Sequence, residues 1–67
     1  MEIVFSVTQE DDGGYVAECL SLPIVTEGDT WVDLKANVLD AVNGYFFDSP
    51  RQVSIRLQLR REELVTT

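Results

Sequence analysis

The sequence contains no histidine and a single cysteine, Cys19, among its 67 residues. One cysteine cannot form an internal disulfide, and without histidine the chain offers few ligands for a structural zinc ion. We therefore expect no metal or other cofactor, and a cysteine that serves only in packing because no histidine can activate it. Chains this short usually need a disulfide, a metal ion or oligomerisation to stabilise a small core. With the first two excluded, oligomerisation remains. We expect a homo-oligomer, either a dimer or a tetramer.

Basic residues are also scarce, since five lysines and arginines accompany twelve aspartates and glutamates, for a formal charge of −7. Residues 1–34 hold eight acids and no base, whereas residues 35–67 hold four acids and five bases. An acidic half repels phosphate backbones, so we expect no direct binding of DNA. The charge favours a basic partner, although it can also serve solubility alone. The bases are Lys35, Arg51, Arg56, Arg60 and Arg61.

Long hydrophobic runs and targeting signals are absent as well. No apolar run approaches the ~18 residues of a membrane span, and residues 1–12 lack the basic start and cleavage site of a signal peptide. We expect a cytoplasmic protein, in agreement with an unpaired cysteine. The length predicts a single domain over residues 1–67, with a polar, frayed tail at 60–67.

Alternation of apolar and polar residues predicts four strands. Residues 2–9 are rich in β-branched and aromatic side chains, and the Asp-Gly and Gly-Gly pairs that follow favour a hairpin turn to a second strand at 15–20. Pro23 interrupts this strand, and the β-branched run at 24–26 predicts a third. Residues 52–59 alternate again, with one apolar face for a core and one polar face for water.

The spacing of apolar residues predicts one amphipathic helix over residues 31–47. Thr30 is a suitable N-cap, Asp33 follows it at the position of a capping-box acid, and the Asp48-Ser49-Pro50 run ends the helix. The order of strand, strand, strand, helix and strand predicts an α+β domain. We expect a three- to four-stranded sheet with one helix packed on one face.

Four short motifs follow one another along the chain: Asp12-Gly13-Gly14-Tyr15-Val16-Ala17-Glu18, Leu22-Pro23, Gly28-Asp29-Thr30, and Asn37 in the helix. In this order and spacing they resemble the N-terminal domain of HicB-like antitoxins, over nearly the whole chain. The resemblance implies a truncated RNase-H-like fold, which agrees with the pattern of elements. It also implies a function, which is to bind and mask a small basic RNA-cleaving toxin of the HicA type.

Full antitoxins of this family usually add a C-terminal DNA-binding domain, and this chain ends at Thr67 without one. We therefore expect toxin neutralisation rather than repression. The alternative is a stand-alone homo-oligomeric structural or interaction protein of the same fold whose toxin partner has been lost. An RNase-H-like nuclease would need several carboxylates converging on metal ions, and the truncated fold lacks the half that supplies the others. We expect no enzymatic activity.

Five acids are candidates for contact with a basic partner: Glu10, Asp11, Asp12, Glu27 and Asp29. The first three also have a structural interpretation, because aspartate favours turns and tolerates their backbone angles. A metal site is a third interpretation, although the spacing does not fit an EF-hand loop.

Phe46, Phe47 and Arg56 are candidates for an oligomer interface. We expect Tyr45 on the apolar stripe of the helix. Successive helical residues point roughly 100° apart, so Phe46 and Phe47 should lie at the edges of this stripe or outside it. Exposed aromatic side chains indicate an interface. Alternatively, the helix ends early and the rings fold over the edge of the sheet. Arg56 belongs to the outer face of the last strand, where it can pair with acids of a second subunit.

Overall fold

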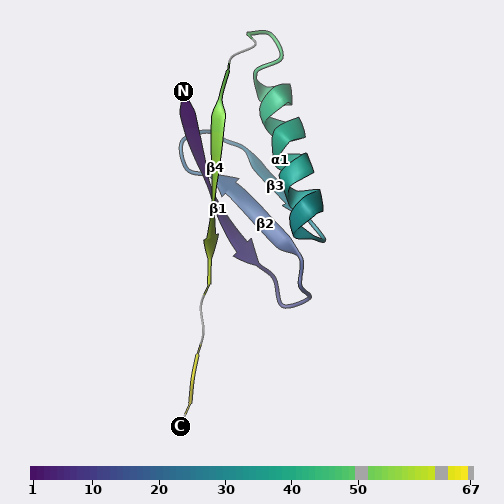
Figure 1. The fold of residues 1–67 in the computed structure, drawn as a ribbon, viewed down its shortest axis with the longest axis vertical. Helices are drawn as coiled ribbons and strands as arrows, with labels where there is room; N and C mark the ends of the chain where they lie inside the picture. Colours follow the sequence, from purple (N-terminus) through teal and green to yellow (C-terminus); the bar gives the residue numbers. More distant parts are fainter. Residues whose placement is uncertain (50–51, 62–63, 67) are drawn as a thin grey trace.

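The computed structural model of the protein describes residues 1–49, 52–61 and 64–66. They form a four-stranded mixed sheet with one helix on one face, as Figure 1 shows. The elements in chain order are β1 (Glu2–Gln9), β2 (Tyr15–Cys19), β3 (Val25–Gly28), α1 (Trp31–Tyr45) and β4 (Ser54–Arg60). The expected α+β class and β-β-β-α-β order are confirmed.

Several strand boundaries differ slightly from the sequence prediction. The third strand extends to Gly28, because Glu27 and Gly28 pair with Val16 and Tyr15 of β2. The last strand includes Arg60, which the sequence interpretation assigned to the tail. Both extensions follow from the neighbouring strand, which supplies partners that local sequence does not reveal.

The helix ends at Tyr45 rather than at residue 47. Phe46 leaves the helical conformation, with φ −103° and ψ 20°, although its N–H still donates to the carbonyl of Val42 at 3.1 Å. Thr30 has the extended conformation of an N-cap, which confirms that prediction. Other predictions lie at least partly outside the described residues: a helix stop at Pro50, a strand-end position for Arg51, and a frayed tail over 60–67.

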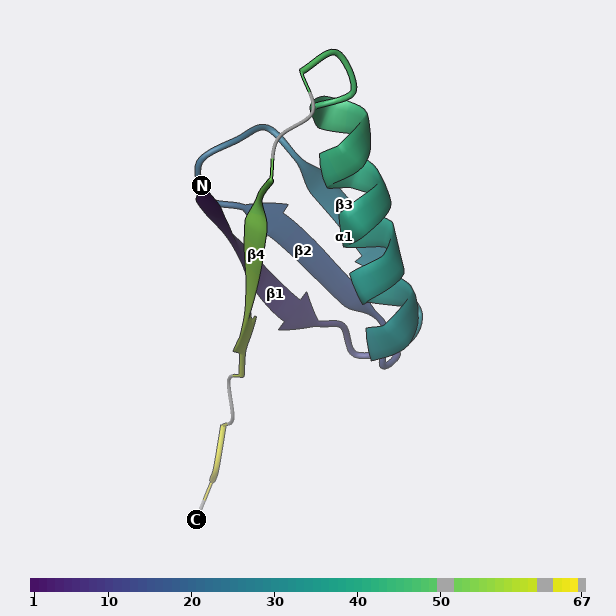
Figure 2. The same ribbon diagram turned by 45° about the horizontal axis from the view of Figure 1, so that its top comes forward.

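The strand order is β3-β2-β1-β4, so β1 is central. It pairs antiparallel with β2 and parallel with β4, and β2 pairs antiparallel with β3. The helix carries the chain from the β3 edge of the sheet to the β4 edge. It packs mainly on β3 and to a lesser extent on β2, as Figure 2 shows, and so leaves the β4 side less covered.

The core lies between α1 and the sheet. Phe5 and Val7 of β1 are completely buried, as is Leu34 of the helix, because alternate residues of a strand and one stripe of a helix face each other. Cys19 is a buried free cysteine in this core, as the sequence predicts. The buried apolar residues are Ile3, Phe5, Val7, Ala17, Cys19, Ile24, Leu34, Val38 and Val42.

Gly28 allows the start of α1 to approach the sheet closely. A Cβ atom placed on Gly28 would lie 2.5 Å from the backbone nitrogen of Leu34 and 2.7 Å from its Cα. Both atoms belong to the helix backbone, which cannot move aside as a flexible side chain can. Glycine is therefore required at the end of β3 for the observed packing of the helix.

We predict opposite effects from two glycine-to-alanine substitutions. Gly28→Ala should lower the free energy of unfolding by about 1–3 kcal/mol, because the methyl group pushes the helix off the sheet. Gly44→Ala is the matched control, since a Cβ atom added at Gly44 would have nothing within 4 Å and the residue belongs to the exposed side of α1. It should raise the same free energy by about 0.5–1 kcal/mol. Urea unfolding followed by circular dichroism measures both, and equal effects would contradict the close approach.

Candidate functional site

The turn between β1 and β2 is built by its own polar residues. The N–H of Gly13 donates to the carbonyl of Glu10 at 2.9 Å, and Gly13 has a positive φ of 94°. The N–H of Gly14 donates to Oδ1 of Asp12 at 3.0 Å. Such a bond from an aspartate to the backbone two residues on stabilises a tight turn. The structural interpretation therefore accounts for Oδ1 of Asp12, although Glu10, Asp11 and Asp12 are all exposed.

Pairing of β2 with β3 brings the second group of acids beside this turn. Tyr15 at the start of β2 lies opposite Gly28, so the end of β3 adjoins the beginning of the hairpin strand. A hollow of about 190 Å³ results, and four of the five predicted acids line it. These four are Glu10, Asp12, Glu27 and Asp29. Asp11 is exposed in the same turn but does not line the hollow.

A sixth acid belongs to the same surface and was missed by the sequence interpretation. Asp33 lines an adjoining hollow of about 330 Å³ together with Glu27 and Asp29. Its backbone N–H donates to Oγ1 of Thr30 at 3.1 Å, which is the N-cap bond that the sequence predicts. The capping position of Asp33 was the available signal, because it fixes this acid in the first helical turn. We call Glu10, Asp11, Asp12, Glu27, Asp29 and Asp33 the acidic surface.

Two side-chain contacts hold the helix beside these acids. Asn37 of α1 donates from Nδ2 to the carbonyl oxygen of Glu27 at 2.7 Å, which ties the helix to β3. The rings of Tyr15 and Trp31 meet edge to face with centroids 5.4 Å apart, which ties the first turn of the helix to β2. Asn37, one of the motif residues, thus acts by positioning the acidic surface.

The carboxylates of the acidic surface face water without basic neighbours. Within the described residues, no lysine or arginine lines either hollow, and no ion pair involves these acids. The positive end of the helix dipole favours carboxylates at the start of α1, which includes Asp33. No three potential ligands in the described parts of the chain are arranged to hold a metal ion. The arrangement is suited to contact with cationic side chains of another molecule.

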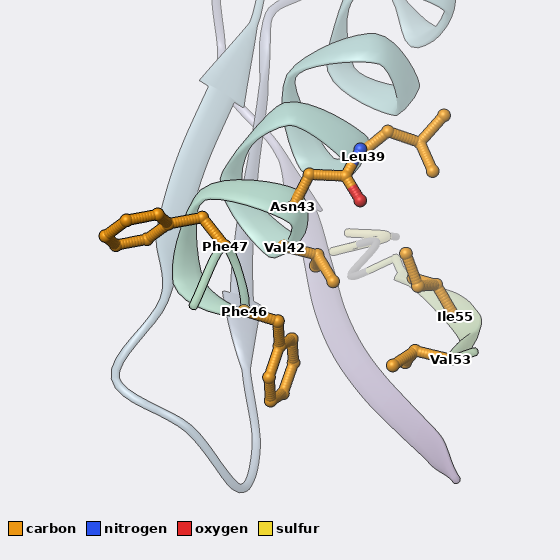
Figure 3. A pocket seen from close by; sticks show the side chains of 7 residues that line it. All are labelled: Leu39, Val42, Asn43, Phe46, Phe47, Val53 and Ile55. Atoms are coloured by element: carbon orange, nitrogen blue, oxygen red, sulfur yellow. The ribbon is translucent and has the colours of Figure 1, made fainter. Parts of the chain in front are cut away.

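The aromatic residues after the helix differ in part from the prediction. Tyr45 was expected on the buried stripe, but 47% of its surface is exposed, so this prediction is wrong. Because the helix ends there, Phe46 turns inward and packs against the core instead, and its ring meets that of Tyr45 edge to face. Phe47 is 73% exposed. Figure 3 shows the two phenylalanine side chains pointing in different directions.

Phe46 and Phe47 lie beside a groove of about 280 Å³ between the end of α1 and the start of β4. Figure 3 shows Val53 and Ile55 on its sheet side and Val42 on its helix side. The groove is open because α1 packs mainly over β3 and β2 and covers β4 less. Its lining is mostly apolar, so it is a second surface distinct in chemistry from the acidic one.

Arg56, the third residue predicted at an interface, forms an ion pair within its own chain. Its Nε lies 2.9 Å from Oε1 of Glu2 on the neighbouring strand β1. This hydrogen bond and the charge of Arg56 lower the pKa of Glu2 below its ordinary value of 4.5 and raise that of Arg56. Both side chains are well exposed, so the pair adds little stability. A role for Arg56 between subunits stays a prediction.

Comparison with known proteins finds a clear relative. A protein of Thermotoga maritima described as a UPF0150 protein is 39% identical to this chain over 56 residues, covering 82% of this chain and 80% of the relative. No family model matches the sequence, and no solved structure matches it significantly. The described residues include no helix long and apolar enough to cross a bilayer.

The ion pair predicts a pH-dependent difference between two variants. The folded state lowers the pKa of Glu2, so its contribution to stability is present above the ordinary value of 4.5 and is lost as the pH falls through the folded-state value. Glu2→Gln should therefore slightly lower the thermal midpoint at neutral pH and have no effect in acid.

The matched control is Glu18→Gln, which removes another exposed acid that forms no ion pair among the described residues. It corrects for the change in net charge. Thermal scans by circular dichroism across the acidic range measure both variants. Identical pH profiles for the two would show that the pair does not form in solution.

Proposed function

This chain belongs to the UPF0150 family, which is HicB-like, and we propose on this basis that it is an antitoxin module. In this proposal it binds a small basic RNA-cleaving toxin of the HicA type and masks the surface with which the toxin contacts RNA. The observation that carries the proposal is the acidic surface, where acids distant in sequence meet around one hollow.

A surface that inactivates an RNA-cleaving protein can compete with RNA by resembling its charge. RNA-binding surfaces are rich in lysine and arginine because they contact phosphates. The acidic surface offers such residues several carboxylates from one corner of the fold, where the hairpin turn, the end of β3 and the first turn of α1 meet. Long-range attraction between opposite charges would also speed the encounter of the two proteins.

The distribution of charge gives the proposed complex an orientation. Residues 1–34 contain eight acidic residues and no lysine or arginine. The last strand instead carries Arg56 and Arg60, at the opposite edge of the sheet from β3. A basic toxin would therefore approach the β3 side and be repelled from the β4 side. The proposed place of action is the cytoplasm, and the proposed mechanism is occlusion without a catalytic step.

The test is co-expression of the chain with the small basic protein encoded beside its gene. We expect a complex that survives purification and a rescue of growth when the chain is present. The double variant Glu10→Lys with Glu27→Lys reverses charge on both sides of the hollow. It should raise the dissociation constant about tenfold or more at low salt, and the loss should shrink as salt screens the charges.

The matched control is Glu18→Lys with Asp40→Lys, which makes the same change of net charge at exposed acids outside the acidic surface. This control should bind nearly as the unmodified chain does. Equal losses from both double variants would mean that only net charge matters. Absence of a complex and of rescue would remove the antitoxin proposal and favour the alternative, a stand-alone homo-oligomer, for which the open groove beside β4 is the supporting observation.

A further inference from the structure

The two edge strands of the sheet differ in how far they are covered by the rest of the chain. At the β3 edge the strand is short and the helix packs against it. The side-chain amide of Asn37 also donates a hydrogen bond to the carbonyl oxygen of Glu27 there. At the other edge β4 runs from Ser54 to Arg60 without proline or glycine, and no described part of the chain pairs with its outer side. Unpaired edge strands attract other strands, and proteins usually cover or interrupt them. The open edge of β4 is therefore available for pairing with another strand.

The backbone of β4 presents a regular set of free groups at this edge. The N–H of Ser54 donates to the carbonyl of Met1 at 2.8 Å, so Ser54 points its backbone groups toward β1. Backbone groups of successive strand residues point to alternate sides. Those of Ile55, Leu57 and Leu59 therefore point away from β1, toward the open edge.

The side chains of the same residues form an apolar strip. Ile55 and Leu57 are only half-buried, and Leu59 is 42% exposed, because α1 covers β4 only in part. The strip continues into the groove of Figure 3, which Leu39 and Phe47 also line. Incomplete burial on this side follows from the position of the helix and would be relieved by a second apolar surface.

We propose that a second copy of this chain pairs with β4 along this edge, antiparallel, about a two-fold axis at Leu57. This is the register that pairs the whole of Ser54–Arg60 with itself. It places Leu57 opposite Leu57 of the second copy and Ile55 opposite its Leu59. All three have outward backbone groups, so each facing pair can exchange both of its main-chain hydrogen bonds.

The charges on β4 select this register. With the axis at Leu57, Arg56 faces Gln58 of the second copy and Arg60 faces its Ser54. Moving the axis to position 56 would place the two Arg56 side chains opposite each other, and moving it to position 58 would place Arg56 opposite Arg60. Like charges directly opposite each other destabilise a strand pair. The arginines therefore permit the full-length register with the axis at Leu57 and disfavour the two registers with the axis at position 56 or 58.

The pairing would also cover the apolar side chains of β4 that the helix leaves partly exposed. Facing residues of an antiparallel pair point to the same side of the sheet, so the two apolar strips join. Both helices lie on that side of the joined sheet. A second copy suits this edge better than a basic toxin does, because Arg56 and Arg60 would repel the toxin. The inference does not depend on the antitoxin proposal, and it leaves the acidic surface free.

Two substitutions at the exposed residue Gln58 test the register. Sedimentation of the unmodified chain at micromolar concentration should give a dimer. Gln58→Arg places like charges opposite each other twice and should raise the dissociation constant of the dimer about tenfold. Gln58→Glu faces Arg56 of the second copy and should lower it. If only general repulsion between negatively charged chains mattered, Gln58→Glu would raise the dissociation constant and Gln58→Arg would lower it, because Gln58→Glu makes the chain more acidic.

The control for edge position is Val25→Arg, which adds an arginine at an exposed residue of the opposite edge strand β3. It should leave the dimer intact. Amide hydrogen exchange by NMR adds a readout of the backbone: the N–H groups of Ile55, Leu57 and Leu59 should be protected and lose protection on dilution. A monomer at micromolar concentration would overturn the proposal. So would a dimer that only Val25→Arg weakens, or in which these three amides exchange freely.

Discussion

The approach of the helix backbone to Gly28 is the contact on which the rest of the arrangement depends. A side chain at this position would meet the backbone of Leu34, so the first turn of α1 can reach the end of β3 only because residue 28 is glycine. That contact places Asp33 beside Glu27 and Asp29, and it sets the helix over β3 and β2. The same displacement leaves β4 less covered by the helix than β2 and β3 are. The acidic surface and the open strand edge are thus two results of one packing contact.

Local patterns predicted the elements well because each depends on neighbours in sequence. Alternation over residues 2–9 defines β1, and Thr30 caps α1 as expected. Features that depend on distant residues were harder to predict. The extension of β3 through Glu27 required the register with β2, and so did the convergence of the acids. Tyr45 was predicted to face the core and is exposed, whereas Phe46 packs against the core. This difference depends on where the helix ends, which the spacing of apolar residues alone does not determine.

The motif residues that resemble HicB-like antitoxins act mainly on the backbone. Gly13 and Asp12 form the hairpin turn, Gly28 admits the helix, and Asn37 binds the carbonyl of Glu27. These residues build the corner of the fold at which the acids meet. The sequence could therefore identify the scaffold before it could identify the surface, because the acids form one surface only after the scaffold brings them together.

The two edges of the sheet are proposed to serve different molecules, a basic partner at the β3 side and a second copy at β4. Chemical-shift mapping on the isotope-labelled chain, with the neighbouring gene product added stepwise, tests this separation most directly. We expect the shifts to concentrate in residues 10–14 and 27–33 and to leave residues 55–59 unchanged. Shifts concentrated on β4, with the acidic surface unaffected, would contradict the separation.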